Sequence, residues 1–225
     1  MTKKLRLCIL MTMSIFSLSA HAAVSIAKVA EVYLGNAEIA HSDSMEASNG
    51  VVNVVNSAIN DSSEASNTSL DALEAAKTAN ANAQAPNRDE YNEAMKFAQN
   101  SAELSKRLEN AVMSEYKAAV AGATTAKALA VVAGDGAKNA ENLSTNADAL
   151  AAKFNFSIGP NDKKFLKEAA EKARALANEA AEKAEQAETV AAKTIEQVSL
   201  ANKAALRAKE IVAGIKPYTG SASPK

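Results

Sequence analysis

The fold is decided by residues 166–215, which read LKEAAEKARALANEAAEKAEQAETVAAKTIEQVSLANKAALRAKEIVAGI. Small or apolar residues recur in this stretch at alternating intervals of four and three, the seven-residue repeat of helices that pack along a seam. Because most seam residues are alanine, we expect a long helix whose axis approaches its partners at the lower end of the usual ~8–10 Å range. The seam consists of Leu166, Ala170, Ala173, Ala177, Ala180, Ala184, Ala187, Ala191, Thr194, Val198, Ala201, Ala205, Ala208, Val212 and Ile215.

Two earlier segments carry the same repeat, and two interruptions separate the three segments. The first interruption is Pro86 and the second is the run 158–162, which reads IGPND. Proline and glycine end helices, and asparagine or aspartate caps the helix that follows. The sequence therefore predicts an all-α fold, an elongated antiparallel three-helix bundle with alanine-rich coiled-coil seams. Its helices are expected at about 24–85, 87–155 and 163–214.

The first two seams contain weak points. Gly50 in the first segment is expected to mark a bend or local break. The run Gly134-Asp135-Gly136 in the second lowers helix stability by about 1 kcal/mol per glycine relative to alanine, but the seam keeps its phase across it, so we expect a flexible spot or a kink there and not a chain reversal. The first seam is also the most polar of the three. It reads Ala37, His41, Ser44, Ser48, Val51, Val55, Ala58, Ser62, Ala65, Ser69, Ala72, Ala76, Ala79 and Ala83, and the second runs in the same steps from Ala98 to Phe154.

The N-terminus has the pattern of an export signal, which we assign to residues 1–22. A basic start is followed by the apolar stretch 7–18 and by Ala20-His21-Ala22, whose small residues stand where signal peptidase reads them. Residues 23–216 are then the bundle and 217–225 a flexible tail. The mature chain is expected to be exported, to a cell surface or the surrounding medium, or to the periplasm if the source is bacterial.

Composition limits the function classes. Of the 25 basic residues three belong to the leader, which leaves 22 against 26 acidic residues and a mature net charge of −4. This balance disfavours nucleic acid as a partner. The only cysteine, Cys8, lies in the leader, and His41 is the sole remaining histidine. Zinc sites and nucleophile–base pairs draw mainly on these two residue types, so we expect no enzyme, no metal and no cofactor, and a structural role for His41.

Bulky side chains gather near the second interruption. Antiparallel topology would bring them to the same end as the start of the first helix. They either fill the end of the bundle, where alanine would leave space, or form a binding pole for a protein partner. The candidate pole consists of Phe154, Phe156, Ile158, Phe165 and Leu166, with Tyr33 and Leu34.

Two further features concern the surface and the membrane. Asn-x-Ser/Thr sequons, which are candidate N-glycosylation sites, occur at Asn60, Asn67, Asn142 and Asn155. Residues 118–134 are nearly continuous in apolar and small side chains, but alanine contributes little to membrane insertion and Lys127 opposes it. We therefore expect this segment to be buried in the bundle and the mature chain to have no transmembrane segment.

In composition and organisation the mature chain resembles the alanine-rich and glutamate/alanine-rich surface coat proteins of trypanosomes. The resemblance rests on the export signal, the three long alanine-rich segments and runs such as 168–173 (EAAEKA) and 180–185 (AAEKAE). It implies an elongated helical bundle that packs beside neighbouring coat molecules. Those proteins end in a lipid-anchor signal, whereas only Pro224 and Lys225 follow Ser223 here, so any surface anchoring would use an undetermined route.

The sequence thus favours an exported, non-enzymatic helical rod that acts as a cell-surface coat or as a spacer or binding protein. Two alternatives stay open at this point. One is a secreted helical toxin that forms pores or remodels membranes, and the other is a bacterial periplasmic helical protein.

Overall fold

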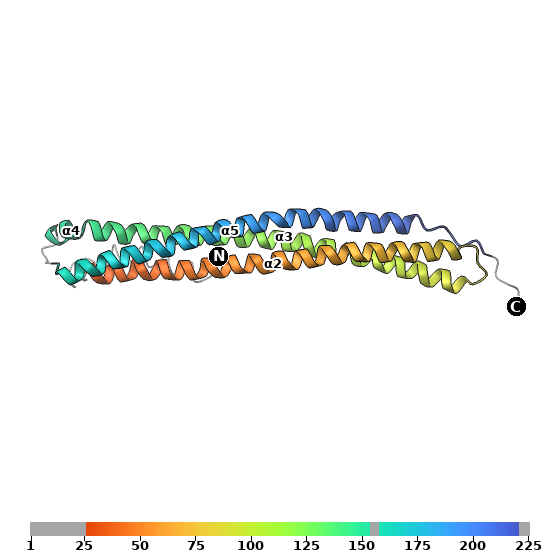
Figure 1. Cartoon of the computed structure of the whole chain (residues 1–225), viewed down its shortest axis with the longest axis horizontal. Coiled ribbons are helices and arrows are strands. Elements are labelled where there is room, and N and C mark those ends of the chain that lie inside the picture. The colour runs from red at the N-terminus through yellow and green to blue at the C-terminus, as the bar shows by residue number, and fades with distance from the viewer. Residues whose placement is uncertain (1–25, 154–157, 221–225) are drawn as a thin grey trace. The chain divides into compact units, whose positions relative to one another are not determined.

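A computed structural model describes residues 26–153 and 158–220, and all regular structure in these two ranges is helical. The helices are α2 (Ile26–Asn82), α3 (Arg88–Thr145), α4 (Ala147–Lys153) and α5 (Pro160–Ala213), labelled in chain order in Figure 1. The predicted all-α class is confirmed for the described part of the chain. The export signal expected at residues 1–22 lies outside it.

Burial follows the predicted seams closely. The interior consists mainly of methyl-sized side chains, and the largest fully buried ones are only Leu166, Val51 and Val112. Glu109, the one charged residue in the second seam, is partly covered, and the neighbouring Leu108 packs against the core instead. Buried members of the third seam are Ala173, Ala177, Ala180, Ala184, Ala187, Ala191, Thr194, Ala201, Ala205 and Ala208.

The contacts group the chain into two compact units. Unit 1 contains the described residues up to Glu46 together with Thr125–Glu185, and unit 2 contains Ala47–Thr124 together with residues 186–220. Each unit includes part of α2, α3 and α5. The repeat continues without a change of phase at these boundaries, so nothing in the sequence indicated the division.

Serine hydroxyls connect facing helices in both units. In unit 1 Ser44 Oγ on α2 donates a hydrogen bond to the carbonyl of Ala126 on α3, at 3.1 Å. In unit 2 the direction is reversed, and Ser105 Oγ on α3 donates to the carbonyl of Ala65 on α2, also at 3.1 Å. A short side chain reaches the backbone of another helix only where the two axes are close, as the small-residue seams predict.

The local break expected at Gly50 is not observed, and the helix also continues through the glycines of the second segment. Helix α2 continues through Gly50, and α3 continues through Gly134 and Gly136. A Cβ atom added at Gly50 or Gly134 would meet nothing within 4 Å, whereas one added at Gly136 would lie 3.2 Å from the carbonyl oxygen of Tyr33 and 3.3 Å from Cβ of Ala37. Gly136 therefore allows α2 and α3 to approach closely within unit 1.

The interruption occurs later, at Asn146. Helix α3 ends at Thr145 and not near 155, and the short α4 follows. The Asn146 side chain donates to the carbonyl of Asn142 at 2.9 Å, which is the local side-chain bonding by which asparagine competes with helix. Helix α5 begins at Pro160, three residues earlier than expected, because proline needs no N–H partner at a first helical position.

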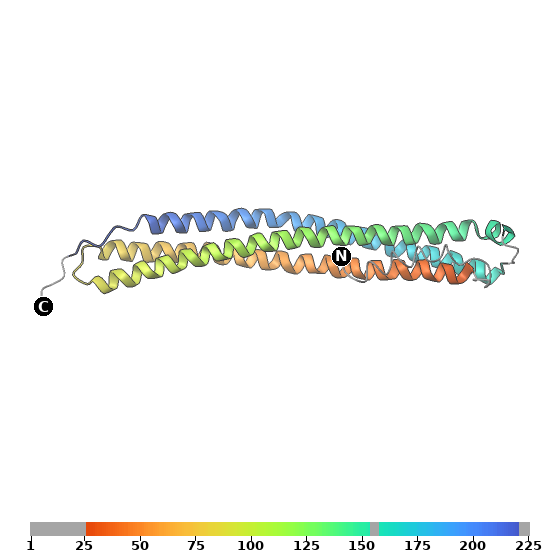
Figure 2. The ribbon, with the colours of Figure 1, turned by 180° about the vertical axis from the view of Figure 1, so that it is seen from behind.

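The C-terminal segment corrects the expectation of a flexible tail from residue 217. In unit 2 it runs along the α2–α3 connection, as Figures 1 and 2 both show. The Tyr91 hydroxyl donates to the carbonyl of Lys216, the Tyr218 hydroxyl to that of Ala85, and the Thr219 N–H to that of Ala83, each at 2.8 Å. Residues 217–220 are therefore held in place, and 221–225 lie outside the described residues.

Candidate functional site

The candidate pole in unit 1 has a packed apolar centre. Leu166 is 1% exposed and lies in a cluster with Ala30, Ala147 and Ala169. The half-buried residues Ile26, Leu34, Leu143, Ile158 and Phe165 pack against that cluster. The sequence prediction that bulky residues from the first and third segments meet here is confirmed for Leu34, Ile158, Phe165 and Leu166. These residues pack against one another as core residues do. Leu166 is too deeply buried to contact a binding partner.

Three other members of the predicted pole have different positions. Phe154 and Phe156 lie outside the described residues, as does the sequon at Asn155. Tyr33 does not belong to the apolar cluster. Its side chain lines a neighbouring groove of about 430 Å³ on the same unit.

This groove is polar on one wall. Asn139, Asn142 and Asn146 line it together with Tyr33 and Lys153, and Leu143, Ala149 and Leu150 complete the lining. The three asparagines are spaced by three and four residues, which places them on one side of a helix. Each amide offers both hydrogen-bond donors and an acceptor, so the groove suits a ligand rich in hydrogen-bonding groups, such as a peptide segment. The asparagine spacing in the sequence could have indicated this wall. The sequence predicts Tyr33 at this end of the fold, but in the apolar pole and not in this groove.

Ion pairs join the helices around this end of unit 1. Lys172 of α5 contacts Glu38 of α2 at 2.6 Å, and Lys163 contacts Asp148 of α4 at 2.7 Å. All four side chains are substantially exposed, so each pair contributes little to stability.

His41 is half-buried, as its place in the first seam predicts. Its Nε2 atom is buried and lies 3.1 Å from Oε2 of Glu179, in an orientation that does not form a hydrogen bond. The contact is an ion pair only when the imidazole is protonated.

Two of the three described sequons, those at Asn60 and Asn67, share one arrangement. Asn60, Asn67 and Asn142 are exposed. The serines that complete the first two sequons, Ser62 and Ser69, are buried seam residues. An asparagine two residues from a seam position points away from the bundle partners, so a glycan attached there would extend into solvent without disturbing the core.

One carboxyl group in unit 2 is electrostatically unusual. Burial raises the pKa of Glu115 above its ordinary value of 4.5, the negative charge of Asp61 raises this pKa further, and a hydrogen bond with Ser57 lowers it. Its Oε2 atom is buried and accepts no hydrogen bond. Glu115 lies on α3, whereas Ser57 and Asp61 lie on α2. These three residues therefore lie on the sides of α2 and α3 that face each other.

No described helix has a stretch long and apolar enough to cross a membrane. In the same residues no group of three or more histidine or carboxylate side chains is arranged to hold a metal ion.

Comparison with protein-family models, with curated proteins and with solved structures finds no match to this chain.

Proposed function

We propose that this chain is an exported, non-catalytic helical rod that serves as a cell-surface coat or spacer protein. In this proposal α2, α3 and α5 form a single elongated antiparallel three-helix bundle. The partners are other proteins or neighbouring coat molecules, and the asparagine-lined groove with Tyr33 is the place where a protein partner would bind.

The small-residue seam is the observation that carries the proposal. Helices α2, α3 and α5 have 57, 58 and 54 residues, which corresponds to about 80–87 Å each at 1.5 Å per residue. Their buried residues are almost all alanine, serine or valine. Small buried side chains allow long helices to pack closely along their length. Such a bundle can be long and thin, because it does not need the large side chains that fill a globular core.

Small-angle scattering of the mature chain tests the shape. A bundle as long as its helices should have a radius of gyration of about 25 Å or more, whereas a compact domain of this size would have about 16 Å. The smaller value would reject the rod and with it the spacer function.

Location requires a separate measurement. Intact source cells should be treated with a membrane-impermeant amine label, and the recovered protein should be examined by mass spectrometry. We expect labelled lysines and a mature N-terminus at Ala23. The same spectra would report glycans at Asn60, Asn67 or Asn142 and any anchor. Protein that remains unlabelled in intact cells and becomes labelled after lysis would contradict a surface role.

A further inference from the structure

The asparagine-lined groove of unit 1 contains a candidate site of modification. Residues 142–144 read Asn-Leu-Ser, which is a sequon for N-glycosylation. Asn142 is exposed and lies in the wall of the groove, with Asn139 one helical turn before it and Asn146 one turn after it. An oligosaccharide attached to Asn142 would therefore begin at the groove wall.

The sequons at Asn60 and Asn67 differ from the one at Asn142 in this respect. Unit 2, to which both belong, has a groove of about 720 Å³ between α3 and α5 and one of about 550 Å³ between α2 and α3. Neither asparagine lines either of these grooves. An oligosaccharide on Asn60 or Asn67 would extend into solvent, whereas one on Asn142 would meet the other residues of the groove in unit 1.

The backbone at Asn142 is held in place. Its carbonyl accepts a hydrogen bond from the Asn146 N–H at 3.0 Å and a second one from Asn146 Nδ2 at 2.9 Å. Both bonds close the last turn of α3, which ends at Thr145. The side chain of Asn142 takes no part in them. The point of attachment is thus fixed at the groove, while the amide group that would be modified is left available.

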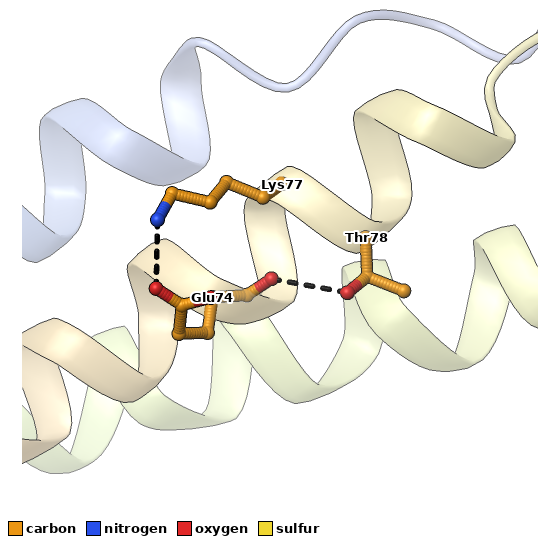
Figure 3. Close-up of polar contacts among 3 residues, drawn as sticks. All are labelled: Glu74, Lys77 and Thr78. Atoms are coloured by element: carbon orange, nitrogen blue, oxygen red, sulfur yellow. Dashed lines mark hydrogen bonds and ion pairs between the residues drawn. The ribbon is translucent and has the colours of Figure 1, made fainter.

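The polar groups of the groove in unit 1 are not used up within their own helices. The 550 Å³ groove of unit 2 gives the contrast, because the Thr78 hydroxyl in its lining donates to the carbonyl of Glu74 at 3.1 Å, as Figure 3 shows. In unit 1 the side chains of Tyr33, Asn139 and Asn142 form no hydrogen bond within the described part of the chain. Their donors and acceptors can therefore serve a ligand.

The lining suits the first sugars of an oligosaccharide. Asn139 offers two hydrogen-bond donors and an acceptor, and Asn146 keeps its Oδ1 atom after Nδ2 is used. Tyr33 adds a ring with an apolar body and a polar tip, and Leu143 and Leu150 add apolar surface. Sugars have the same mixture, with hydroxyl groups around the ring and C–H groups on its faces. The groove, of about 430 Å³, is within the range of about 300–1,000 Å³ that holds small ligands.

We propose that glycosylation of Asn142 closes the groove, because the linked oligosaccharide lies across Tyr33 and Asn139 and excludes the protein partner. In the modification a bond forms between Asn142 Nδ2 and the anomeric carbon of a sugar carried on a lipid diphosphate. The bond from that carbon to the diphosphate breaks, the lipid diphosphate leaves, and the amide nitrogen loses one proton to the transferase. This inference rests on the proposed function, since it takes the groove as the partner's site and adds how that site is regulated.

Nitration of Tyr33 reports whether the groove is covered. Two variants of the full mature chain each keep one sequon and are produced in a eukaryotic secretory host. The first keeps Asn142 and carries Asn60→Gln, Asn67→Gln and Asn155→Gln. The second keeps Asn67 and carries Asn60→Gln, Asn142→Gln and Asn155→Gln. Each is compared with the same chain made without glycosylation in the bacterial cytoplasm. All are treated with tetranitromethane, and the tyrosine peptides are quantified by mass spectrometry.

A glycan on Asn142 should slow the nitration of Tyr33 by about three- to tenfold, since a ligand that fills a groove covers most of the surface in contact with it. Tyr116, which belongs to α3 in unit 2, should react at the same rate with and without this glycan and serves as the reference within each sample. A glycan on Asn67 should leave the nitration of Tyr33 unchanged. All forms should have the same helical circular dichroism.

The proposal is overturned if the glycan on Asn142 leaves the nitration rate of Tyr33 unchanged or lowers the helical circular dichroism. It is also overturned if Tyr33 does not react in the unglycosylated chain, since the groove would then be closed already, or if Asn142 stays unmodified in the host that modifies Asn67. None of these results bears on the scattering or labelling of the rod, so the coat or spacer function can stand while this regulation fails. A compact shape in scattering would reject that function whatever the nitration shows.

Discussion

The two glycines near the end of α3 provide a sharp test of how closely the helices approach. Gly134→Ala and Gly136→Ala make the same chemical change two residues apart in one helix. We expect them to affect stability in opposite directions. At Gly134 the new methyl group would meet nothing within 4 Å, whereas at Gly136 it would lie 3.2 Å from the carbonyl oxygen of Tyr33 and 3.4 Å from the N atom of Ala37.

The magnitudes follow from two opposing effects. Alanine in place of glycine stabilises a helix interior by about 0.5–1 kcal/mol, and Gly134→Ala should show this gain in full. At Gly136 the close neighbours include backbone atoms of α2, which cannot rotate away as a side chain can. Overpacking of this kind costs about 1–3 kcal/mol. Gly136→Ala should therefore end up to about 2 kcal/mol less stable than the wild type and about 1–3 kcal/mol less stable than Gly134→Ala.

Urea unfolding followed by circular dichroism measures the difference. The midpoint should rise for Gly134→Ala and fall for Gly136→Ala, with similar dependence on urea concentration in all three proteins. In thermal unfolding each kcal/mol should shift Tm by about 2–4 °C for a chain of this length. Equal stabilisation by both substitutions would refute the close approach of α3 to α2 at Gly136.

Three further predictions concern single side chains. Ala180→Leu should lower the free energy of unfolding by about 1–3 kcal/mol, because Ala180 is fully buried in the seam. The control is Ala181→Leu at the exposed neighbouring position, which should change this free energy by less than about 0.5 kcal/mol when both are measured by urea unfolding. Tyr91→Phe removes the hydroxyl that donates to Lys216 and should cost about 1 kcal/mol; an unchanged Tm would show that the C-terminal segment is held by other contacts. Burial raises the pKa of Glu115, so its protonated form favours the fold below pH 4.5 and this contribution is lost as pH rises through the folded-state pKa. Glu115→Gln should therefore be more stable than the wild type at neutral pH and equal to it below pH 4.5, and an advantage that persists in acid would contradict this assignment.

The seams could be predicted from the sequence because periodicity directly reports which side of a helix is covered. Thirteen of the fourteen residues assigned to the first seam are buried, and the exception, His41, is half-buried. The end of the first helix near Pro86 and the start of the next were also predicted closely. There Asn87 Oδ1 accepts a hydrogen bond from the Asp89 N–H, as a capping residue does.

Features that depend on contacts between distant segments could not be predicted in this way. The role of Gly136 depends on the position of Tyr33, and the C-terminal segment is fixed by Ala83 and Tyr91, more than a hundred residues away. Neither local composition nor periodicity contains this information. The asparagine-lined groove is an intermediate case, because the spacing of its asparagines is local whereas Tyr33 comes from the distant helix α2.

The methyl-sized interior also determines how stability depends on temperature. The heat capacity change of unfolding grows with the apolar area that becomes hydrated, and a buried alanine exposes far less such area than a leucine or phenylalanine. Among the described residues, almost no fully buried side chain is larger than valine. The protein should therefore have an unusually low heat capacity increment per residue. The curve of its free energy of unfolding against temperature should be broad and flat, so that this free energy changes little on either cooling or moderate warming.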